Sequence, residues 1–210
     1  QANNSVSLAS NLAKVEGRNN SYTGGLFGYA DSNSSITDSY NAGLITGTNY
    51  VGGLVGYNGS GLAVKGVFNT GNVSGSSYIG GLFGRLGNSS NLSSAFNTGT
   101  VAGTGSRIAG LVGETYYINN ISFSFSTGAV TGSADTGGLV GRYYGNTRRI
   151  TNSYWATDTS MQASSASENE TDGYVGLTFA ALQCATTANT DSANSSCVSA
   201  DGSTEGLAAA

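Results

Sequence analysis

The sequence has no histidine and no proline, and only two of its 210 residues are cysteine. The absence of histidine removes the usual general base and the commonest metal ligand of proteins. Two cysteines alone cannot form a structural zinc site, and no GxxxxGK[ST] phosphate loop is present. We therefore expect neither a metal nor another cofactor.

Charged residues are also scarce, at 10% of the chain, and they are unevenly distributed. Residues 1–155 hold 8 basic and 5 acidic residues, a balance of +3. Residues 156–210 hold 7 acidic residues and no basic one, a balance of −7. The sequence pI near 4.5 argues against nucleic acid as a partner. No run of 18 apolar residues occurs, so no membrane-spanning helix is expected.

Glycine, by contrast, is abundant, with 33 residues, and it marks a repeat. The strings TGGLFGYA, VGGLVGYN, IGGLFGRL, IAGLVGET and TGGLVGRY follow one another at spacings of 28, 28, 29 and 28 residues. The anchor of each string, the second residue of its GG or AG pair, is Gly25, Gly53, Gly81, Gly110 or Gly138. Between anchors an aromatic residue recurs, usually followed by Asn-Thr-Gly or a close variant. Internal self-similarity of this kind is typical of repeat architectures.

Each period offers three short strands separated by Gly, Asn and Ser turns. A unit of this size cannot bury its apolar face alone, whereas stacked units bury a continuous core. We therefore predict an all-β fold, a three-faced parallel β-solenoid (a right-handed β-helix) of five to six coils over residues 1–155. The alternative is an antiparallel sandwich, which the near-constant period disfavours. Asn41, Asn69 and Asn97 fall in register, which predicts an asparagine ladder.

The repeat resembles a known family. The string Gly52-Gly53-Leu54-Val55-Gly56 and the segment FNTGNVSG at residues 68–75 closely resemble the GLUG repeat of bacterial surface proteins. Ala109 and Ser126 are local departures from that pattern. The resemblance implies secreted or surface-anchored proteins, such as haemagglutinin-like adhesins and the stalks of immunoglobulin-cleaving proteases. It carries no established catalytic residues. The function that it implies is a structural or adhesive module, located outside a bacterial cell.

The acidic tail forms a second predicted unit, a capping segment over residues 156–207. Both cysteines lie in it, and a Cys184–Cys197 disulfide would close a loop of about 13 residues. Two free buried thiols are the alternative. Residues 208–210 are interpreted as a cloning remnant.

Alternation along each anchor string predicts apolar residues on both faces of a regular strand. One apolar set would face the core and the other the outside, where a partner copy or the tail would cover it. The first set is Leu26, Leu54, Leu82, Leu111 and Leu139. The second set is Phe27, Val55, Phe83, Val112 and Val140. Our leading hypothesis is a non-enzymatic structural or adhesive module, which self-associates into fibres through the outward stripe, assigned to the leucines, unless the tail covers it.

Aromatic and basic residues crowd the last full period. They are Arg142, Tyr143, Tyr144, Arg148 and Arg149, and they are joined by Tyr116 and Tyr117 one period earlier, where Tyr116 aligns with Tyr144. Aromatic faces and guanidinium groups suit sugars and acidic glycans, so glycan binding is the alternative function. The same residues would equally serve to hold the acidic tail. Ice binding is less expected, since the column Thr46, Ser74, Ala102 and Thr131 is not a regular threonine array.

Carboxylates are the remaining candidates for catalysis, because many solenoids degrade polysaccharides. Glycoside hydrolysis needs two carboxyl groups about 5–9.5 Å apart. Asp31 and Asp38, in one period, are the pair closest to that requirement, and they straddle a turn. We interpret them as isolated surface carboxylates and expect no enzyme.

Overall fold

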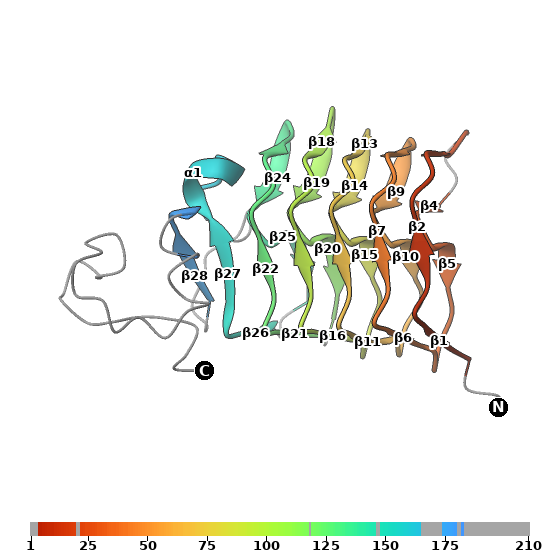
Figure 1. Cartoon of the computed structure of the whole chain (residues 1–210). Helices are drawn as coiled ribbons and strands as arrows, with labels where there is room; N and C mark the ends of the chain where they lie inside the picture. Colours follow the sequence, from red (N-terminus) through yellow and green to blue (C-terminus); the bar gives the residue numbers. More distant parts are fainter. Residues whose placement is uncertain are drawn as a thin grey trace.

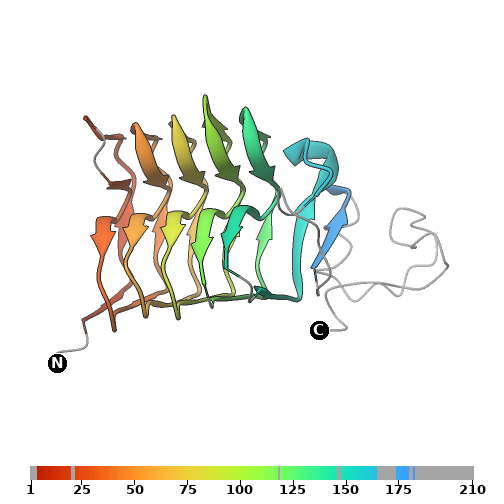
Figure 2. The same cartoon turned by 180° about the vertical axis from the view of Figure 1, so that it is seen from behind.

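In a computed structural model of the chain, the described residues are 4–19, 22–117, 119–145, 148–164, 174–179 and 182. The protein is a parallel β-solenoid, as predicted, and all strand pairs are parallel. The coils stack along one axis, from β1 near the N-terminus to β28 at the opposite end (Figure 1; Figure 2). Each coil carries five short strands instead of the three predicted, so the strands form five sheets.

Three of the sheets enclose the main body of the solenoid. Sheet A comprises β1 (Ser5–Ser7), β6 (Ser35–Thr37), β11 (Ala63–Lys65), β16 (Asn91–Ser93), β21 (Asn119–Ser122) and β26 (Arg148–Thr151). Sheet B comprises β2 (Ser10–Asn11), β7 (Tyr40–Asn41), β12 (Phe68–Asn69), β17 (Phe96–Asn97), β22 (Phe125–Ser126), β27 (Ser153–Ala156) and β28 (Tyr174–Leu177). Sheet E comprises β5 (Phe27–Ala30), β10 (Val55–Asn58), β15 (Phe83–Leu86), β20 (Val112–Tyr116) and β25 (Val140–Tyr144).

The other two sheets form a side lobe, which stands above the body in Figure 1. Sheet C comprises β3 (Val15–Glu16), β8 (Ile45–Thr46), β13 (Val73–Gly75), β18 (Val101–Gly103) and β23 (Val130–Thr131). Sheet D comprises β4 (Thr23–Gly24), β9 (Asn49–Gly52), β14 (Ser77–Gly80), β19 (Ser106–Ala109) and β24 (Ala134–Gly137).

Each lobe has its own apolar core. In the body, Ile36, Val64 and Leu92 of sheet A pack in one cluster with the residues that follow the GG bends. In the side lobe, a separate cluster joins Val73 of sheet C to Ile79 of sheet D and their equivalents in the other coils. The 28-residue coil is therefore folded into a large and a small loop, which explains why it holds more strands than a simple triangle.

The two lobes meet at a narrow neck. There the chain passes from sheet B to sheet C through an Asn-x-Gly turn and returns from sheet D to sheet E through the GG bend. The predicted asparagine ladder fills the neck: Asn41 Nδ2 donates to Asn69 Oδ1 at 2.6 Å, and Asn69 Nδ2 to Asn97 Oδ1 at 2.8 Å. A Cβ on Gly53 would lie 2.6 Å from Asn69 Cγ, so glycine is needed there.

The GG bend also overturns the predicted outward leucine stripe. The string VGGLVGYN is two strands, β9 and β10, joined by a bend at Gly53 and Leu54. The bend breaks the alternation, so Leu54 and Val55 both point into the body core and are 0% exposed. Leu82, Leu111 and Leu139 are fully buried as well, while Leu26, in the first coil, is partly buried against the same cluster. These leucines are therefore not exposed on an outer face, and the predicted outward leucine stripe is wrong.

The outer face of sheet B does carry an apolar column, formed by other residues. Tyr40, Phe68, Phe96 and Phe125 stack face to face with ring centroids 4.8–5.0 Å apart. Tyr154 continues the column in β27, and all five rings are half-buried. Their spacing matches the roughly 4.8 Å strand separation of a sheet, so the aromatic stack follows directly from the register.

The described part of the segment after Trp155 covers the C-terminal end of the rod (Figure 1). Trp155 replaces the ladder asparagine and lies against Gly138, and α1 (Thr157–Ser160) follows it. Gln162 donates to the Val130 carbonyl at 2.9 Å, and β28 extends sheet B beyond β27. Cys184, Cys197 and residues 208–210 lie outside the described residues. Within those residues, no helix has the length and apolarity needed to cross a bilayer.

Candidate functional site

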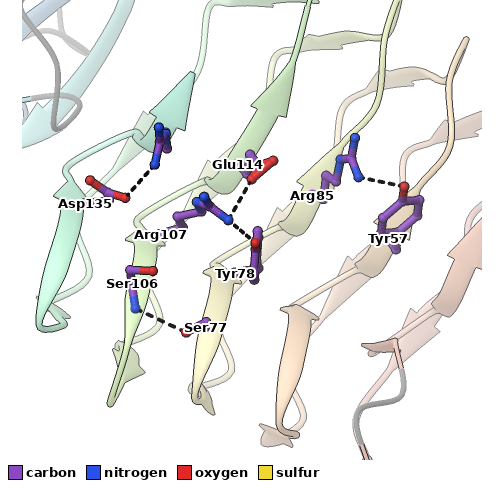
Figure 3. Close-up of polar contacts among 9 residues, drawn as sticks. Tyr57, Ser77, Tyr78, Arg85, Ser106, Arg107, Glu114 and Asp135 are labelled. Carbon is purple, nitrogen blue, oxygen red and sulfur yellow. Dashed lines mark hydrogen bonds and ion pairs between the residues drawn. The ribbon is translucent and has the colours of Figure 1, made fainter. Parts of the chain in front are cut away.

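Two outward-facing columns of large polar side chains run side by side along the solenoid axis. One lies on sheet D, three residues before each anchor glycine: Tyr22, Tyr50, Tyr78, Arg107 and Asp135. The other lies on sheet E, four residues after each anchor glycine: Tyr29, Tyr57, Arg85, Glu114 and Arg142. We call these ten residues the double ladder. Part of it is drawn in Figure 3.

The two columns meet because glycine lets the sheets approach. A Cβ on Gly56 of sheet E would lie 2.7 Å from the backbone oxygen of Tyr50 in sheet D. Tyr50, Tyr78, Arg107 and Asp135 all have a positive φ, between 48° and 65°. This left-handed conformation, at the second residue of β9, β14, β19 and β24, is uncommon for such residues. The positive φ recurs at equivalent residues of successive coils, and the side chains of these residues meet those of sheet E.

The first coils of the double ladder are aromatic. Tyr22 lies 4.6 Å from Tyr57 between ring centroids, and Tyr29 stacks on Tyr57 at 5.6 Å. Tyr50 stacks on Tyr78 at 4.3 Å. Burial, reinforced by Tyr78, raises the pKa of Tyr50 to about 12, so its phenol is neutral at physiological pH. Tyr22 and Tyr29 remain well exposed, which leaves aromatic surface open to a ligand.

The later coils of the double ladder are charged. Arg107 Nη1 lies 3.4 Å from a carboxylate oxygen of Glu114 (Figure 3). Arg142 Nη1 lies 3.5 Å from a carboxylate oxygen of Asp135. Glu114 is only 5% exposed, and burial raises its pKa although Arg107 and other arginines act in the opposite direction. Arg107 also donates to the Tyr78 hydroxyl, which joins the charged half to the aromatic half.

Arg85 lies where the two halves meet. Its Nη1 donates to the Tyr57 hydroxyl at 2.7 Å. Its guanidinium carbon lies 4.9 Å from the centre of the Tyr57 ring and 4.3 Å from that of Tyr116. Arg85 is thus held between two aromatic rings, each of which attracts a cation over its face.

The structure divides the predicted tyrosine and arginine cluster among several places. Tyr116, Tyr117 and Tyr144 lie together, with Tyr116 stacked on Tyr144 at 4.7 Å as their alignment predicted. Tyr143 points inward and is only 7% exposed, because it alternates with Arg142 and Tyr144 along β25. The surface role expected for Tyr143 is therefore wrong.

The arginines of that cluster separate too. Arg142 belongs to the double ladder. Arg149 is exposed on sheet A, and Arg148 lies in the same strand, with its side chain outside the described part. The sequence reasoning missed most of the double ladder, although both of its columns keep a constant distance from the anchor glycines.

Asp31, one of the two acids expected to be isolated, lies beside Tyr29 at the end of the double ladder. Asp31 and Asp38 lie beyond opposite ends of β6 and are exposed. Asp31 lines a cavity of about 340 Å³ near the first coils, whose other lining residues carry no second carboxylate. Within the described ranges, no three acidic or cysteine side chains gather as ligands for a metal ion.

The fold and repeat define the chain as a parallel β-solenoid with 28-residue coils. No family model, curated protein or solved structure matches it.

Proposed function

We propose that the chain is a non-enzymatic adhesive module of an extracellular bacterial surface protein, and that it binds carbohydrate through the double ladder. The observation that supports this most directly is the continuous row of tyrosines joined to arginines along one outer surface. The resemblance to GLUG repeats supports the cellular setting, in which the chain would adjoin other modules of a larger protein.

Tyrosine rings offer flat apolar faces for sugar rings together with hydroxyls for hydrogen bonds. Tyr29 and Tyr57 lie in register on neighbouring strands of sheet E, about 4.8 Å apart along the axis, and Tyr22 lies beside both. Because Tyr29 and Tyr57 stack on each other, the pair offers ring edges and hydroxyls to a ligand. A linear polymer lying parallel to the rod would meet them in succession. Tyr116 and Tyr144 extend the same aromatic surface on the far side of Arg85.

A glycan array followed by calorimetry with the bound glycans tests this proposal. We expect a Tyr29→Ala, Tyr57→Ala double variant to bind about tenfold more weakly, since each aromatic contact is worth about 0.5–1.5 kcal/mol. Tyr40→Ala is the matched control, because Tyr40 is a half-buried tyrosine on the outer face of sheet B. Equal losses in both variants, or no glycan binding by the wild type, would contradict the proposal and leave a purely structural stalk.

A further inference from the structure

Arg85 is the one arginine of the double ladder without a carboxylate partner among the described residues. Arg107 pairs with Glu114, and Arg142 pairs with Asp135. Glu114 is the neighbour of Arg85 in the sheet E register, yet its side chain pairs with Arg107. The charge of Arg85 is therefore not neutralised by direct contact, in a chain whose formal net charge is −4.

Neutral aromatic groups hold the Arg85 side chain in place. Tyr57 accepts a hydrogen bond from Nη1, and the rings of Tyr57 and Tyr116 lie on the guanidinium. Figure 3 shows the second terminal nitrogen directed away from Tyr57. Arg85 is half-buried, and its Nε is buried without a hydrogen-bond partner. The side chain is thus pre-organised, and ordering it on binding would cost little entropy.

The charge balance around Arg85 favours an anion. The double ladder contains three arginines and two acids, and the two acids pair with Arg107 and Arg142. A planar guanidinium matches a carboxylate with two parallel N–H donors. Aromatic surface continues on both sides of Arg85. The parts of a ligand on either side of a bound anion would therefore lie beside tyrosine rings.

We propose that Arg85 forms a subsite for the carboxylate of a uronic acid unit within a linear acidic glycan. The adjoining sugar units contact the exposed ring edges and hydroxyls of Tyr57 and Tyr29 on one side and of Tyr116 and Tyr144 on the other. This assignment rests on the proposed function and narrows it to one class of ligand.

Calorimetry on the full chain tests the subsite with hexamers of galacturonate, mannuronate and hyaluronan, each beside its methyl ester. The ester keeps the sugar and removes the charge. We expect at least one acidic hexamer to bind about tenfold more tightly than its ester. We expect Arg85→Gln to bring the acid to the affinity of the ester, and Arg85→Lys to give an intermediate value. Arg149→Gln, at an exposed arginine on sheet A, is the matched control and should bind as the wild type does.

The outcomes separate the subsite from the proposed function. Equal affinity for acid and ester, with binding still lost in the Tyr29→Ala, Tyr57→Ala variant, would overturn the subsite and leave glycan binding intact. Binding of neutral or sulfated glycans alone would likewise overturn the uronate assignment. Absence of binding to any glycan would overturn both. Thermal unfolding of Arg85→Gln and Arg85→Lys, compared with the wild type, verifies that a lost affinity reflects the side chain and not the fold.

Discussion

Glu114 is the buried carboxylate of the double ladder. It is almost fully buried beside Arg107, in a chain where charged residues are few. Water stabilises a carboxylate better than this position does, and so burial raises the pKa of Glu114 despite the nearby arginines. The ionised form is consequently a cost to the folded state at neutral pH.

The pH dependence of stability follows from that shift. Between the ordinary and the raised pKa, the folded protein holds a proton that the unfolded chain releases, so stability falls as pH rises through the raised value. We expect Glu114→Gln to be more stable than the wild type at neutral pH. The difference should shrink as pH falls into the ordinary carboxyl range. Urea unfolding of both proteins over this pH range measures it.

Glu16 provides a control of opposite sign. Its carboxylate is exposed, and the hydrogen bond from Lys14 lowers its pKa. The stability that this contact gives is present at neutral pH and is lost as pH falls. Glu16→Gln should therefore be slightly less stable than the wild type at neutral pH, with a difference that also disappears in acid. A Glu114→Gln difference that keeps its size in acid would contradict the assigned cause.

At the scale of elements, the bend between β9 and β10 decides which side chains reach the core. A regular strand through VGGLVGYN would place Leu54 and Val55 on opposite faces. The bend at Gly53 instead turns both toward the body, where they join one apolar cluster. The apolar periodicity was therefore a correct sign of burial and a misleading sign of an exposed stripe, because hydropathy does not report where a backbone bends.

Substitution at this bend should be severely destabilising. A Cβ on Gly53 would collide with the Gly81 carbonyl of the next coil and lie 2.6 Å from Asn69 Cγ. Backbone atoms cannot move aside as a side chain can, so Gly53→Ala should cost about 3 kcal/mol or more, the upper end for overpacking. Gly59→Ala is the control, since the nearest atom there is the Tyr29 hydroxyl at the end of a flexible side chain. Equal urea midpoints for the two variants would contradict the close packing at the neck.

At the scale of the whole molecule, the solenoid is a one-dimensional stack in which each coil contacts its neighbours. Stability is then approximately a sum of coil and interface contributions. The asparagine ladder crosses these interfaces, because each inner asparagine is hydrogen-bonded to the coils on both sides of it. Asn11 begins the ladder and makes one ladder bond, to Asn41 in the next coil, beside its hydrogen bonds with Ala13.

Position in the stack should therefore set the effect of a ladder substitution. Asn69→Ala removes the acceptor of Asn41 and the donor to Asn97, both fully buried. Because each buried group left unsatisfied costs about 1–3 kcal/mol, we expect a loss of roughly 2–4 kcal/mol. Asn11→Ala removes one ladder bond at a half-buried site and should cost about 1 kcal/mol. Urea unfolding followed by circular dichroism compares them, and equal losses would contradict a coil-by-coil ladder.

The sequence by itself determined the parallel stacking and the asparagine ladder. A constant 28-residue spacing places equivalent residues in register once coils stack, whatever path each coil follows. Only the tertiary structure decided how a coil is folded into two lobes and which columns become neighbours. Tyr50 and Tyr57 lie in different columns, and the GG bend between them brings their ring centroids within 5.3 Å. The two rings are close because the backbone changes direction at the glycines. Neither the repeat spacing nor the hydropathy pattern of the sequence specifies the angle of that bend.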